Sequence, residues 1–162
     1  PKLVRKGSPI AQVNGSTNII AIEGEEIGTT IFSGPGAGMG PTASSVVSDL
    51  VAIASRKSKS TFLTGKKISG TNKYEPNSKK SSFYLRFILK DKPGVIARLS
   101  GQLSNSGISI NQMKQKPLAK QKATLIMVTH KTFQENLEKA LIDIKKLKIC
   151  ELRPVCIEIQ EI

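Results

Sequence analysis

The sequence predicts an α+β protein with two structured parts joined by a basic segment. Residues 82–162 alternate strand-like and helix-like apolar patterns in the order βαββαβ. Residues 1–55 contain two strand-like runs and then one helix-like stretch. Residues 56–81 are rich in Ser, Thr, Gly, Asn and Lys and show no apolar period. A chain of 162 residues, 38% of them hydrophobic, can bury one modest core or two small ones.

The net charge of +13 is spread unevenly along the chain. Residues 1–55 hold three Lys/Arg against four Asp/Glu, residues 56–81 hold eight against one, and residues 82–162 hold fourteen against seven. Basic residues interleaved with aromatics would suit a nucleic acid. However, aromatics make up only 4% of the chain, Trp is absent, and no zinc-finger or RNA-recognition signature occurs. We therefore interpret residues 56–81 as a flexible, solvated linker and expect no specific nucleic-acid partner.

Cellular location is predicted from what the sequence lacks. It contains no run of 18 apolar residues, which a membrane-spanning helix would need, and its first residues form no apolar signal core. Cys150 and Cys156 lack metal-ligand spacing, and on one strand they would lie about 20 Å apart, too far for a disulfide. These features predict a cytoplasmic protein with no metal site.

The first part begins with a short helical turn, for which Ser8 is the expected cap and Pro9 the first helical residue. Two β-rich runs follow at residues 17–23 and 27–32, joined by a hairpin turn at residues 24–26. A helix is then predicted up to residue 55, capped by Thr42 or Ser44. Its apolar stripe is formed by Val46, Val47, Leu50 and Ile53.

A glycine-rich loop, GPGAGMGPT at residues 34–42, precedes this helix. A loop of this kind can hold an anion, because glycines allow close approach and a helix start presents unpaired N–H groups. The loop lacks the Gly-Lys-Ser/Thr of a phosphate loop. It also misses the dinucleotide fingerprint, because Met39 occupies the third glycine position counted from Gly34 and Gly36. The pattern alone leaves open a structural turn or a ligand contact.

The string GPGAGMGPTASSVVSDLVAIA at residues 34–54, with SPIAQVNGSTN before it, closely resembles the end of the catalytic domain of homoserine dehydrogenases. Members of that family reduce aspartate 4-semialdehyde to homoserine with NADPH or NADH. The resemblance implies that Gly36, Ala37, Gly38 and Thr42 lie at the junction with a dinucleotide domain and bind the cofactor. Gly36 or Gly38 is expected to touch it.

Other parts of that family's pattern have no counterpart in this sequence. These are the N-terminal nucleotide-binding domain and the stretch that carries the catalytic Lys and Asp/Glu. We therefore assign no catalytic residue to this chain, expect no dehydrogenase activity from it alone, and expect it not to bind NADP or NAD tightly. The nucleotide-binding domain is expected as a partner.

The second part is read element by element. Alternation of apolar residues predicts a strand at residues 83–90, and Asp91-Lys92-Pro93-Gly94 forms a turn before a helix at residues 95–105 that Gly107 ends. A second strand is expected around residues 108–110, a polar connection at 117–121, and a third strand at 123–130. Thr132 and Glu135 predict a capping box for a second helix. A fourth strand is expected at residues 150–159. This order predicts a ferredoxin-like fold.

The same part resembles an ACT domain, whose hallmark is D-x-P-G-V before a helix and G-I-x-I after it. Here these residues are Asp91, Pro93, Gly94, Val95, Gly107, Ile108 and Ile110. ACT domains bind small effectors, usually amino acids, where the first loop meets the second strand of a neighbouring copy. Homoserine dehydrogenases often carry one at the C-terminus.

The effector site is predicted from the needs of a zwitterion, which are donors for its carboxylate and an acceptor for its ammonium. The helix start at Gly94 supplies backbone N–H groups as donors. Asp91 supplies an acceptor, and the Asn111 side chain can both donate and accept. The alternative is that Asp91 only caps the helix and Asn111 is a surface residue. With the resemblance, we predict effector-binding residues Asp91, Pro93, Gly94, Val95 and Asn111. Threonine is the favoured effector, followed by isoleucine and methionine.

The sequence thus predicts a regulatory C-terminal portion of a homoserine dehydrogenase. Residues 1–55 would be a piece of its catalytic domain with no core of its own, 56–81 the linker, and 82–162 the ACT domain. Exposed edges and a bare sheet face favour a homodimer. The alternative function is a freestanding binding module or a weak nucleic-acid-binding adaptor.

Overall fold

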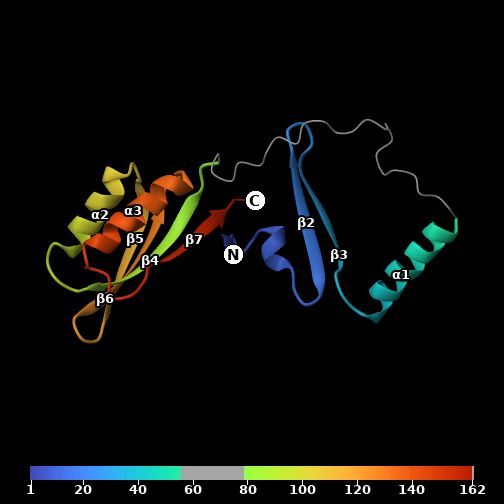
Figure 1. Cartoon of the computed structure of the whole chain (residues 1–162), viewed down its shortest axis with the longest axis horizontal. Helices are drawn as coiled ribbons and strands as arrows, with labels where there is room; N and C mark the ends of the chain where they lie inside the picture. The colour runs from blue at the N-terminus through green and yellow to red at the C-terminus, as the bar shows by residue number, and fades with distance from the viewer. Residues whose placement is uncertain (56–78, 162) are drawn as a thin grey trace. The chain divides into compact units, whose positions relative to one another are not determined.

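The computed structural model describes residues 1–55 and 79–161, which form two compact units (Figure 1). The C-terminal unit comprises Pro1–Arg5 and Tyr74–Ile162, and the N-terminal unit comprises Lys6–Lys73. The predicted linker at 56–81 falls almost wholly outside the described residues. Every helix among residues 1–55 and 79–161 is too short or too polar to span a membrane.

The C-terminal unit is a five-stranded sheet with two helices on one face (Figure 1). The strand order is β1-β7-β4-β6-β5, and all pairs except the β1–β7 pair are antiparallel. The strands are β1 (Lys2–Val4), β4 (Ser82–Lys90), β5 (Ile110–Leu118), β6 (Lys122–Thr129) and β7 (Val155–Gln160), and the helices are α2 (Val95–Asn105) and α3 (Gln134–Lys146). Strands β4 to β7 and the two helices form the ferredoxin-like βαββαβ arrangement that the sequence predicts.

The core lies between the sheet and the two helices. Alternate residues of β4 and β6 are buried, because successive side chains of a strand point to opposite faces. Helices α2 and α3 each bury one stripe against them. The largest fully buried side chains include Leu85, Phe87, Leu99, Leu103, Leu125, Met127, Leu137 and Ile144.

Strand β1 was not predicted. Its three residues extend the sheet by pairing in parallel with β7, beyond the predicted boundary at residue 82. Lys2 Nζ lies 3.0 Å from Glu158 Oε1 and 2.9 Å from Gln160 Oε1, and Ser81 Oγ donates to Glu158 at 2.8 Å. Partial burial would raise the pKa of Glu158, but the hydrogen bonds from Lys2 and Ser81 outweigh it and hold that pKa below its usual value.

Strand β5 is longer than the sequence predicts, because it continues through Pro117, where a polar connection was expected. A proline fits in an edge strand, where its missing N–H can face away from the ladder. Residue Asn111 lies at a register irregularity between Ile110 and Gln112. The turn to β6 contains Lys120 and Gln121, both at positive φ.

The helix ends give a mixed result. Helix α2 has the predicted bounds, and Gly107 follows it at φ +71° while the Ile108 amide donates to Leu103 O at 2.9 Å, as predicted for a glycine stop. The capping box predicted for α3 is wrong. The N-cap is Phe133, and the Thr132 hydroxyl is buried with no hydrogen-bond partner among the described residues.

The N-terminal unit consists of a 3₁₀ turn η1 (Pro9–Gln12), a hairpin of β2 (Thr17–Gly24) and β3 (Gly28–Pro35), and α1 (Met39–Ala54). The predicted cap of the turn is confirmed, since Ser8 Oγ accepts from the Ala11 amide at 3.3 Å. The predicted cap of α1 is wrong. Gly38 occupies the N-cap at φ +127°, and Thr42 lies in the first turn.

The N-terminal unit has no apolar core among its described residues. All buried apolar side chains belong to the C-terminal unit. Val46, Val47, Leu50 and Ile53, the predicted stripe of α1, are all exposed, from 54% to 75%. This agrees with the expectation that residues 1–55 cannot bury a core alone.

Candidate functional site

The loop between β4 and α2 positions the candidate effector site. The Asp91 amide donates to Gln121 O at 2.8 Å, and the Lys92 amide donates to Lys90 O at 3.1 Å, so the loop leaves the sheet in a fixed turn. Gly94 has φ +81°, in the left-handed region that glycine adopts without strain. This turn directs the chain into α2 at Val95.

A small recess of about 30 Å³ lies beside this loop, with an apolar interior and a polar rim. Its apolar lining comes from β4, α2 and β6, and includes Leu89, Val95, Ile96, Ala123 and Leu125. Its polar lining is Lys90, Asp91, Lys92 and Gln115. Gln115 Nε2 donates to Asp91 Oδ1 at 3.3 Å, which joins the loop to β5.

The recess offers complementary groups for an amino acid. Asp91 is an exposed acceptor for an ammonium, whereas Lys92 and the Gln115 amide group are donors for a carboxylate. The Arg98 amide donates to Gly94 O and the Val95 amide to Lys92 O. Within the described part of the chain, the amides of Ile96 and Ala97 have no acceptor, so α2 adds the partial positive charge of its N-terminus.

The predicted effector residues are only partly brought together. Asp91 and Val95 line the recess, and Pro93 and Gly94 form the turn between them. Asn111 lies near the start of β5, four residues before Gln115, and does not line the recess. Sequence reasoning missed Gln115, because a glutamine in a run of polar residues carries no signal until the strand register is known.

The glycine-rich loop before α1 has a structural explanation. A Cβ at Gly36 would collide with the side chain of Asn18, and the Gly36 amide donates to Ser16 O at 2.6 Å. Gly38 O accepts from the Thr42 amide at 3.1 Å. The contacts of Gly36 hold the loop against the start of the hairpin, and the bond between Thr42 and Gly38 is the first hydrogen bond of α1. That Gly36, Ala37, Gly38 and Thr42 bind a nicotinamide cofactor stays a prediction.

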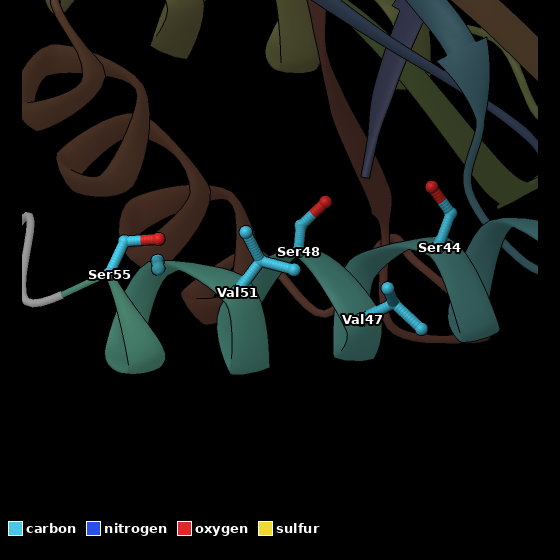
Figure 2. A pocket seen from close by; sticks show the side chains of 6 residues that line it. Ser44, Val47, Ser48, Val51 and Ser55 are labelled. Carbon is cyan, nitrogen blue, oxygen red and sulfur yellow. The ribbon is translucent and has the colours of Figure 1, made fainter.

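A shallow hollow on α1 is lined by Ser44, Val47, Ser48, Val51, Ala52 and Ser55 (Figure 2). All six residues belong to α1 or follow it directly, so the hollow has a single wall. It is an exposed helix face rather than an enclosed binding site.

Both cysteines are free, as the sequence predicts. Cys150 pairs with Leu89 and Cys156 with Leu85, four residues apart on β4. Their Cα atoms are thus separated by about 13 Å along the strand, beyond disulfide reach. Partial desolvation raises the pKa of both thiols, and Glu138 raises that of the exposed Cys156 further. No group of three potential metal ligands exists among the described residues.

Comparison with known families matches both parts of the chain. Residues 1–51 match the family model for homoserine dehydrogenase, and residues 83–148 match that for the ACT domain. The second match covers β4 through α3, including the recess beside Asp91.

Individual relatives give the same result. The chain is 32% identical to a homoserine dehydrogenase of Helicobacter pylori over 91% of its own length and 35% of the relative. It is 33% identical to the homoserine dehydrogenase of Bacillus subtilis, over 93% of this chain and 36% of that relative. A crystal structure of a homoserine dehydrogenase from Thiobacillus denitrificans matches with a TM-score of 0.76 and 28% identity, over 99% of this chain and 38% of that one. The chain thus spans about a third of the length of the curated relatives it matches.

Proposed function

We propose that this chain, which corresponds to a C-terminal portion of homoserine dehydrogenases, acts as the regulatory part of such an enzyme. The parent enzyme would interconvert L-homoserine and L-aspartate 4-semialdehyde with NADPH or NADH, in the cytoplasm, on the route to threonine, methionine and isoleucine. The two family matches and their order along the chain support this proposal.

The proposed role of the C-terminal unit is to bind an amino-acid effector in the recess beside Asp91. The observation that carries this proposal is the hydrogen bond from Gln115 of β5 to Asp91 in the loop that leads to α2, at the polar side of the recess. The recess of about 30 Å³ has room for about one or two water-sized groups. That size favours the short side chain of threonine over isoleucine or methionine.

The sheet edges support pairing with a second copy through β5. Strand β1 covers the β7 edge, whereas β5 is the other edge of the sheet, and among the described residues no strand pairs with the side of β5 that faces away from β6. An uncovered edge presents unpaired backbone groups that another strand can join. In a dimer of this kind, Asn111 of one copy would approach the loop of the other, as the ACT resemblance implies.

The cofactor, NADP or NAD, would be held by the rest of the parent enzyme. Hydride transfer needs a positioned cofactor and a proton donor, and we assign neither to this chain. We therefore propose that the chain alone does not oxidise NADPH in the presence of aspartate 4-semialdehyde. Measurable oxidation by the purified chain would overturn this assignment.

The effector proposal is tested by a thermal-shift screen of the protein amino acids at millimolar concentration. Threonine should raise the melting temperature, since a ligand that binds only the folded state stabilises it. Asp91→Asn should abolish the shift, because it removes the anionic acceptor for the ammonium. Asp143→Asn, which changes an exposed α3 carboxylate bonded to Lys146, is the matched control and should retain it. A screen with no hit, or a shift that survives Asp91→Asn, contradicts the proposal.

A further inference from the structure

A second and larger groove lies on the C-terminal unit, away from the recess beside Asp91. One wall is formed by Leu141, Ile142 and Lys145 of α3, and the other by residues 150–156, which lead into and begin β7. Its volume is about 830 Å³, within the range of small-molecule sites. None of its lining residues belongs to the effector site predicted from the ACT resemblance or to the recess beside Asp91.

The groove combines an apolar surface with exposure to solvent. Ile142 of one wall is 59% exposed and Leu152 of the other is 62% exposed, and Pro154 and Val155 extend the apolar lining. Large apolar side chains that gather around a hollow mark a binding surface more often than scattered ones do. A ligand with a hydrocarbon part could cover them.

The charges of the groove favour an anion. Each wall contributes one cation, Lys145 from α3 and Arg153 from the loop, and neither side chain has a hydrogen-bonding or ionic partner among the described residues. The only acidic group in the lining is Glu151, which is engaged by Lys122 at 2.8 Å. The lining therefore has two cations available and no carboxylate without a cationic partner; Glu138 of α3, which acts electrostatically on Cys156, does not line the groove.

We propose that this groove binds a small aliphatic carboxylate, with the hydrocarbon part against Ile142 and Leu152 and the carboxylate between Lys145 and Arg153. The helical wall spans only residues 141–145, about 6 Å of helix, which suits a short molecule rather than an extended peptide. Arg153 can hold a carboxylate through two parallel N–H donors. The site would be a second small-molecule site of the regulatory unit, independent of the amino-acid recess.

The test uses 4-methylpentanoate as probe and the thiol of Cys156 as reporter, because Cys156 lines the groove and is exposed. Binding is measured by isothermal titration calorimetry on the full chain. Alkylation of Cys156 by iodoacetamide is followed by peptide mass spectrometry with and without the probe. The proposal predicts binding and slower alkylation of Cys156, whereas the neutral 4-methylpentanamide should bind at least about tenfold more weakly.

Variants locate the site. Arg153→Gln and Lys145→Gln should each weaken binding about tenfold, whereas Lys139→Gln, an α3 cation outside the groove, should leave it unchanged. Asp91→Asn should also leave it unchanged, which separates this proposal from the amino-acid site. Equal binding of acid and amide, binding that survives both groove variants, or no protection of Cys156 would overturn the proposal.

Discussion

Two buried threonines of the C-terminal unit provide a matched test of its hydrogen bonding. Thr129, on β6, is fully buried, and its Oγ1 accepts from the Phe83 amide of β4 at 3.0 Å. Thr132 is 5% exposed, and its Oγ1 has no partner among the described residues. The two hydroxyls are thus alike in chemistry and burial but differ in whether they form a hydrogen bond.

The perturbation is the isosteric change of each threonine to valine. Thr129→Val leaves the Phe83 amide buried without an acceptor, which should lower the free energy of unfolding by about 1–3 kcal/mol. Thr132→Val removes a hydroxyl that is buried without a partner, so it should be neutral or stabilising by up to about 1 kcal/mol. Only Thr129→Val should therefore destabilise the unit, although both variants replace a hydroxyl by a methyl.

Urea unfolding followed by far-UV circular dichroism measures both variants against the parent chain. The urea slope m of a small unit is about 1–3 kcal/mol/M, so a change of about 2 kcal/mol moves the midpoint by roughly 1 M and is well resolved. A Thr129→Val variant within 0.5 kcal/mol of the parent would refute the reasoning. Equal destabilisation by the two variants would refute it as well.

Three further predictions follow from single contacts. Gly107→Ala should destabilise the C-terminal unit by about 1 kcal/mol, because Gly107 lies at φ +71°. Gly101→Ala, inside α2, should stabilise the unit by about 0.5–1 kcal/mol, because an added Cβ meets nothing within 4 Å. The urea midpoints of the two variants are compared with that of the parent chain. Because the pKa of Glu158 is lowered in the folded state, its contribution is present above the unfolded pKa of about 4.3 and is lost as the pH falls through the folded value. Lys2→Ala should raise the pKa of Glu158 and lower stability at pH 7 by at most about 1 kcal/mol, since the pair is partly exposed; an NMR titration of Glu158 that is unchanged by Lys2→Ala would contradict this. Glu138→Gln should lower the pKa of the Cys156 thiol and speed its alkylation at pH 8, because Glu138 disfavours the thiolate. The alkylation rate is measured by mass spectrometry, with Glu135→Gln as the comparison. Equal rates in the two variants would show that Glu138 has no such effect.

Elements with a strong local signal could be predicted from the sequence. The alternation of Phe83, Leu85 and Phe87 fixed β4, and the turn before Val95 together with Gly107 after it marked both ends of α2. These signals are local because one face of each element is buried, so the apolar period reports the packing directly.

Elements that depend on distant partners could not be predicted. Strand β1 has three residues and no apolar period, and it forms only because β7, more than 150 residues away, offers an edge and Glu158. Strand β5 is polar because it is an edge, so Pro117 suggested a loop. The caps of α1 and α3 were misplaced because the N-caps are Gly38 and Phe133, which have no side-chain acceptor, so the Ser and Thr residues nearby gave a misleading local signal.

The candidate site shows the same division. The turn at Asp91 and Gly94 could be identified from its residue types and spacing. Its partner Gln115 could not, because the contact depends on the register of β5 with β6 and on the bulge near Asn111. The groove between α3 and residues 150–156 had no sequence signal at all, since its two walls are joined only by tertiary packing.

The most direct test of the central claim, that the C-terminal unit senses an amino acid beside Asp91, is an NMR titration of the ¹⁵N-labelled chain with threonine. The account predicts saturable amide shifts that cluster at Lys92, Gly94, Val95 and Gln115, and their loss in Asp91→Asn. Shifts confined to residues elsewhere in the unit, or no shifts at millimolar threonine, would contradict it.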